Sequence, residues 1–92
     1  MTHVAHELSQ EFPDASMAIA HLRESDAHFA RLADRHHALN REIHRIESGA
    51  EAASDQRVEA LKKERLSLLD ALSALIAKGQ RAMPHLTSVK DG

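Results

Sequence analysis

The stretch that decides the fold is residues 29–46, FARLADRHHALNREIHRI, together with its counterpart at residues 58–75, VEALKKERLSLLDALSAL. In both stretches, mostly apolar residues recur every three or four positions. This spacing places them on one side of an α-helix and lets that side pack against a second helix. The first series is Phe29, Leu32, His36, Leu39, Ile43 and Ile46. The second series is Val58, Leu61, Arg65, Leu68, Leu72 and Leu75.

The two series match each other when the helices run antiparallel. Ile43 then faces Leu61 close to the connection, and the pairing continues outward until Phe29 faces Leu75. Such a match is typical of two helices that pack along a common seam. The pattern predicts an all-α fold, namely an antiparallel, coiled-coil-like helical hairpin with a short N-terminal helix before it.

Capping residues set the expected helix boundaries. Pro13 and Asp14 suit the first turn of a helix, Asp26 can accept a backbone N–H where a helix restarts, and glycines 49 and 79 can end helices. Near Asp26 the helix either kinks or breaks. We expect helices at about 14–24, 26–48 and 54–78 in a hairpin domain spanning 14–78, with a partly ordered segment at 1–13 and a flexible tail at 79–92.

The composition narrows the class of protein. The 92 residues suffice for at most one small domain, and they include no cysteine and only two aromatic residues of the Phe, Trp and Tyr types. The first residues lack the basic and apolar regions of a secretory signal. The longest apolar stretch, 66–77, is interrupted by Asp70 and is too short to span a bilayer. We expect a cytoplasmic protein without membrane contact.

Two segments carry a family resemblance. Residues 28–36, HFARLADRH, followed by Leu39 and Ile43, and residues 61–70, LKKERLSLLD, resemble the YdcH-like family of small bacterial proteins, a domain of unknown function. The resemblance covers roughly residues 7–78. It implies a helical hairpin in a bacterial cytoplasmic protein, and it implies no activity. Relatives often have Lys where this chain has Leu69, which widens the apolar face here.

Histidine is abundant, with eight in 92 residues, so we compared its spacing with that of metal ligands. Two ligands on one helix must be three or four residues apart to reach the same ion. Within the expected helices no two histidines have this spacing, although Asp34 and His37 do. We therefore expect no metal, no cofactor and no catalytic residue in a single chain. Several copies together could still gather histidines around one ion.

Two polar residues, His36 and Arg65, interrupt the seam. His36 is either a pH-sensitive packing element or a polar residue that fixes the helix register, as a buried asparagine does in coiled coils. The second interpretation is favoured. Arg65 can lay its aliphatic stem along apolar surface while its guanidinium reaches solvent or Glu42.

Apolar residues beyond the needs of a two-helix seam predict self-association, because exposed apolar patches mark association sites. They lie beside the seam of the second long helix and on the helix that precedes the hairpin. The alternative is that the N-terminal segment and the tail fold back over them. The predicted self-association surface consists of Ile19, Leu22, Leu66, Leu69 and Ile76.

The outer face of the first long helix carries four arginines, and it is the best candidate for nucleic-acid binding. Asp34 and Glu42 share this face and the net charge is −2, so nucleic-acid binding is possible but not favoured. The most consistent function is a non-catalytic, homo-oligomeric interaction module with a protein partner. The alternative is a nucleic-acid-associated regulator that uses Arg31, Arg35, Arg41 and Arg45.

Overall fold

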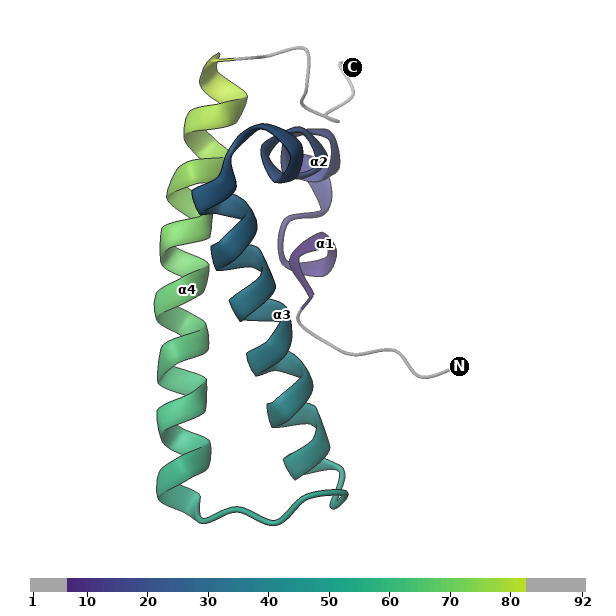
Figure 1. Ribbon diagram of the computed structural model, residues 1–92, viewed down its shortest axis with the longest axis vertical. Coiled ribbons are helices and arrows are strands. Elements are labelled where there is room, and N and C mark those ends of the chain that lie inside the picture. Colours follow the sequence, from purple (N-terminus) through teal and green to yellow (C-terminus); the bar gives the residue numbers. More distant parts are fainter. Residues whose placement is uncertain (1–6, 83–92) are drawn as a thin grey trace.

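A computed structural model describes residues 7–82 of the chain, and they form four α-helices and one short 3₁₀ helix. The two long helices run antiparallel, while α1 and α2 lie beside the upper part of α3 (Figure 1). The described residues contain no strand, and the predicted all-α hairpin is confirmed. In chain order the elements are α1 (Leu8–Glu11), the 3₁₀ helix η1 (Pro13–Ala15), α2 (Ser16–Ser25), α3 (Ala27–Glu47) and α4 (Asp55–Ala82).

The chain breaks, rather than kinks, at Asp26. This residue has extended backbone angles, φ −129° and ψ 104°, and its carboxylate accepts a hydrogen bond from the Phe29 N–H at 3.1 Å. A side chain that satisfies a free N–H in the first turn stabilises the start of a helix. The Ser54 hydroxyl does the same for α4, accepting from the Arg57 N–H at 3.1 Å. Gly49 follows α3 with a φ of 86°, which allows the chain to turn away.

Helix α4 ends later than expected. It continues to Ala82, so the prediction that Gly79 stops it after Lys78 is wrong. The contacts of Gly79 give the reason for a glycine inside the helix: a Cβ atom placed there would lie 3.3 Å from Cδ1 of Leu22 on α2. The missing side chain therefore lets α2 pack closely against α4. The remainder of the predicted tail, residues 83–92, and the first six residues lie outside the described part.

The apolar core has two parts. The upper part joins α1, η1 and α2 to both long helices, and the lower part lies between the long helices alone. The buried members of the upper part are Leu8, Ala15, Ile19, Phe29, Ala33, Leu72 and Ile76. Those of the lower part are Leu39, Ile43 and Leu61, with Ile46 and Leu68 packed against them. Residues before Pro13 thus contribute to the core, because Leu8 is only 6% exposed.

The predicted register can be tested by cross-linking. The chain has no cysteine of its own, so a double variant with Ile43→Cys and Leu61→Cys can form only one intrachain disulfide, the designed one. Both positions lie in the same buried cluster, and we expect rapid oxidation to an intrachain bond, seen as a mobility shift on a non-reducing gel. The matched control pairs Ile43→Cys with Leu68→Cys, two helical turns further along. Faster bridging in the control would show that the register is wrong.

Candidate functional site

A polar layer separates the upper and lower parts of the core. It consists of His36 and Asn40 on α3 and Arg65 on α4. The Arg65 guanidinium donates a hydrogen bond to the Asn40 side-chain oxygen at 3.0 Å, and not to Glu42 as the sequence suggested. Asn40 is 1% exposed and was not singled out from the sequence. Its place four residues after His36, on the same side of the helix, is the signal that could have found it.

His36 is the member of this layer whose side chain lacks hydrogen bonds to residues 7–82. The side chain is completely buried, and neither ring nitrogen has a hydrogen-bond partner among the described residues. A buried polar group without a partner costs about 1–3 kcal/mol. Burial also lowers the pKa of His36 below its ordinary value of 6.5, since the charged ring loses its hydration, and the nearby Arg65 acts in the same direction. The carboxylates of Glu7 and Glu11 oppose this shift but do not cancel it.

The N-terminal helices form a lid of packed side chains above His36. We call residues 7–25 the N-terminal cover. Between the cover and α3 lies a cleft of about 250 Å³, to which Glu7 and Arg23 contribute from the cover and His36 and His37 from α3. At its edge, His37 Nδ1 and Glu7 Oε1 are 3.1 Å apart. A second contact joins Arg23 of α2 to Asp34 of α3, with a 3.5 Å separation. Both polar contacts attach the cover to α3.

The five residues of the predicted self-association surface do not form one exposed patch. Ile19 is 9% exposed and Ile76 is 3% exposed, and both belong to the upper core. Leu22 and Leu69 are partly buried against that core, and only Leu66, at 61%, is well exposed. The prediction of a common exposed surface is therefore wrong. The physical reason is the alternative considered above, that the N-terminal segment folds back over the surplus apolar face.

The predicted arginine face is only partly available to a ligand. The Arg35 guanidinium donates two hydrogen bonds to Glu64 of α4, at 2.7 and 2.9 Å. This contact raises the pKa of Arg35 and lowers that of Glu64, because each charge favours the other. Arg45 likewise donates to Glu51, at 3.2 Å. Arg31 and Arg41 are exposed on the same helix.

The two acidic residues of this face bind arginines of neighbouring helices. They also add negative charge to the face, since Glu42, after Glu64, contributes to the raised pKa of Arg35. Asp34 contacts Arg23 of α2, and Glu42 accepts a hydrogen bond from Arg57 of α4. Together with Lys62 and Glu47, whose charged atoms are 2.8 Å apart, these contacts link the helices around their exposed edges.

Two further classes of site were searched for in residues 7–82. No three histidine or acidic side chains of this part of the chain gather closely enough to hold a metal ion. None of its helices combines the length and the apolar character needed to cross a membrane.

Comparison with known families identifies the hairpin. A family model described as a protein of unknown function, DUF465, matches residues 29–76, which is more than half of the chain. The chain belongs to this family. DUF465 is the YdcH-like family, so the resemblance seen in the sequence is confirmed. The match runs from Phe29 on α3 to Ile76 on α4 and leaves the N-terminal cover outside it. Neither the curated proteins nor the solved structures include a match.

The polar contact between Asn40 and Arg65 gives a stability prediction. Replacing either residue alone, by Asn40→Leu or Arg65→Met, removes the hydrogen bond between them and should destabilise the fold. The double variant should recover part of that loss, with a coupling free energy of roughly 0.5–3 kcal/mol in urea denaturation. The control combines Asn40→Leu with Arg31→Met on the exposed face, and there the two effects should add. Additive effects for the buried pair would contradict its role.

Proposed function

We propose that this protein is a non-catalytic helical module that self-associates weakly and offers its charged faces to a protein partner. One observation carries the proposal: Leu66, an aliphatic residue in the middle of α4, is 61% exposed. Leucine at an exposed helix position contributes nothing to the core of its own chain. Its burial against a second molecule would therefore be a net gain in apolar contact.

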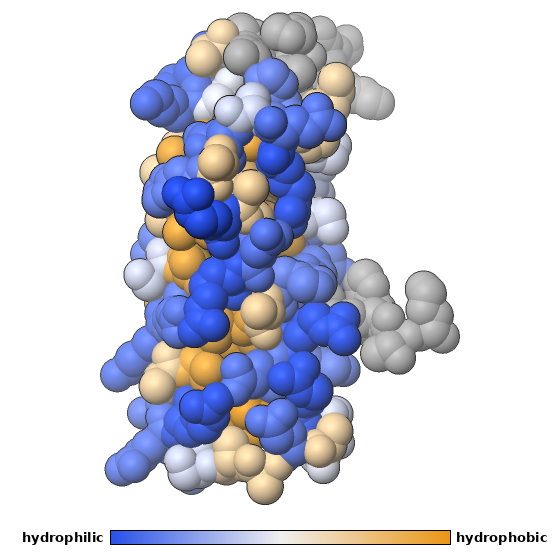
Figure 2. All heavy atoms as spheres, viewed as in Figure 1, coloured by the Kyte–Doolittle hydropathy of each residue, from blue (hydrophilic) through white to orange (hydrophobic). Residues whose placement is uncertain are grey.

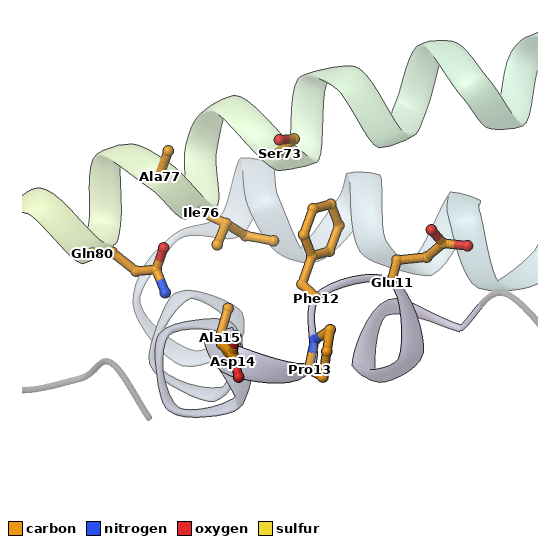
Figure 3. A pocket seen from close by; sticks show the side chains of 9 residues that line it. All are labelled: Glu11, Phe12, Pro13, Asp14, Ala15, Ser73, Ile76, Ala77 and Gln80. Atoms are coloured by element: carbon orange, nitrogen blue, oxygen red, sulfur yellow. The ribbon is translucent and has the colours of Figure 1, made fainter. Parts of the chain in front are cut away.

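Leu66 lies on the same side of α4 as one wall of a cleft. Ser73 lies two helical turns after Leu66 on the same side of the helix and lines a cleft of about 290 Å³. Figure 3 shows this cleft, in which Phe12 points toward α4 and Ile76 points back toward η1. Leu66 and the cleft thus place a protruding apolar side chain and a recess on one side of the molecule. The recess is lined by apolar Phe12 and Ile76 and also by polar Glu11 and Gln80.

A second copy of the chain is the occupant that these features favour. In a two-fold symmetric pair, each contact occurs twice, so Leu66 of each copy can enter the recess of the other. The size of the apolar surface favours a weak association. On the face shown in Figure 2, charged residues surround narrow apolar patches, unlike the broad apolar areas of obligate dimers.

A charge introduced at Leu66 tests this proposal. Burying one leucine contributes roughly 1.5–3 kcal/mol, so Leu66→Glu should lower the association constant by at least about tenfold and leave the helical content unchanged. The matched control is Met17→Glu, since Met17 is another exposed apolar residue, 48% exposed and located on α2. The measurement is sedimentation equilibrium at several concentrations. A wild-type chain that remains monomeric throughout would refute the proposal.

The nucleic-acid alternative makes a different prediction. Binding through four arginines should give a slope of about −3.6 when the logarithm of affinity is plotted against the logarithm of salt concentration. Arg35 and Arg45 already bind Glu64 and Glu51, so we expect a slope no steeper than about −2 and only weak affinity near physiological salt. Fluorescence anisotropy with a labelled duplex provides the measurement. Tight binding with the steeper slope would favour the nucleic-acid function over the interaction module, provided that the double variant Arg31→Gln with Arg41→Gln loses this binding.

A further inference from the structure

The N-terminal cover, residues 7–25, conceals much of the apolar surface that the sequence offers for self-association. It buries Ile76 of α4 and packs against Leu69. The cover contributes its own apolar side chains to the upper core, among them Leu8 and Ile19, which are 6% and 9% exposed. Removing the cover from the hairpin would therefore expose apolar side chains of the cover and apolar side chains of the hairpin to water. This larger surface includes Leu69, which is three residues after Leu66 on α4.

The cover consists of elements that depend on packing. Its helices have four, three and ten residues, and helices this short are marginal in water. Neither Glu7 before α1 nor Ala15 before α2 provides a side-chain cap, whereas Asp26 caps α3. Segments of this type open more readily than the long helices they cover. If a buried group beneath the cover becomes destabilising, the cover will therefore detach from the hairpin more readily than α3 will separate from α4.

His36 lies directly beneath the cover and is the group that can bring about such a change. The side chain is fully enclosed, and both ring nitrogens lack a partner among residues 7–82. We propose that the N-terminal cover is an acid-sensitive lid: protonation of His36 displaces residues 7–25 from the hairpin and frees the apolar surface for a second copy of the chain. This inference rests on the self-association proposed above. Opening removes the recess between η1 and α4 that Leu66 of a second copy enters in the closed form, and it offers in its place the wider apolar face that includes Leu69 and Ile76.

The charged groups around His36 determine the direction of the response. Glu7 and Glu11 approach from the cover and favour the positively charged form of the His36 ring. Arg65 of α4 and His37 of α3 disfavour that form. Arg23 of α2 lines the same cleft and adds a further positive charge. Within residues 7–82 the enclosed ring has no acceptor for its additional proton, whereas water solvates the ring once the cover has moved. Opening is therefore the response that the surroundings favour.

The sign of the pH dependence follows from the pKa of His36. Burial lowers this pKa in the closed state, while the open state returns it toward the ordinary 6.5. The open state thus binds more protons. The stability of the closed state is fully present above pH 6.5, and it is lost as the pH falls through the lower pKa of the closed form. The contact between His37 and Glu7, whose Nδ1 and Oε1 atoms are 3.1 Å apart, joins the cover to α3 and opposes opening.

Hydrogen exchange of the full chain between about pH 8 and pH 5 tests the lid. After correction for the pH dependence of intrinsic exchange, protection of amides in residues 8–25 should fall in acid, because the open state binds the additional proton more readily. Protection at residues 39–43 should remain. His36→Leu should keep the cover protected at both pH values. His44→Leu, two turns further along α3, and His37→Gln should both retain the acid response.

Sedimentation of the same samples separates this inference from the proposed function. Cover opening with a rise in mass supports both ideas. Cover opening without a rise in mass keeps the acid-sensitive lid and refutes self-association. A rise in mass with unchanged protection of residues 8–25 overturns the lid. If His36→Leu does not fold, the pH titration of the His36 ring proton signal in the wild-type chain tests the inference instead. A titration at the ordinary pKa of histidine, with residues 8–25 still protected, would overturn it.

Discussion

Two packed helices can bury only the surface that lies between them, and α4 carries more apolar surface than α3 can cover. Leu69 and Ile76 lie beside the seam and not in it, so a hairpin alone would expose them to water. The rest of the architecture follows from this geometric constraint. Before α3 the chain breaks at Asp26, and α2 crosses the hairpin so that the short helices cover the side left open (Figure 1). The two long helices form the hairpin, and the N-terminal cover buries the apolar side chains that the hairpin alone would leave exposed.

The hairpin could be predicted because its determinants are local and periodic. The three- and four-residue spacing of the seam, the caps at Asp26 and Ser54, and the turn at Gly49 can each be recognised without knowledge of distant contacts. The family match, which spans residues 29–76, rests on the same segment. The bonding partners of Asn40 and Arg65 could not be predicted, because each depends on the rotation of one helix against the other.

The fate of the surplus apolar residues was the main difference between sequence and structure. Their excess over the needs of the seam is visible in the sequence, but periodicity does not reveal whether the covering surface comes from the same chain or from another copy. Leu8 and Ala15 provide that surface here, and they belong to elements of only four and three residues. Elements this short carry almost no periodic signal. The long elements of this protein were therefore predictable, whereas the covering ones became clear only from their contacts.

Gly79 shows how closely these parts constrain one another during evolution. Inside a helix, glycine is less favourable than alanine by roughly 0.5–1 kcal/mol, so a change to alanine would strengthen α4 considered on its own. The added methyl group would press against Leu22, whose Cδ1 is 3.3 Å from the position it would occupy. An alanine at this position therefore requires the Leu22 side chain to move by a few tenths of an ångström. Helix stability and the fit of the cover thus act in opposite directions at a single Cα atom.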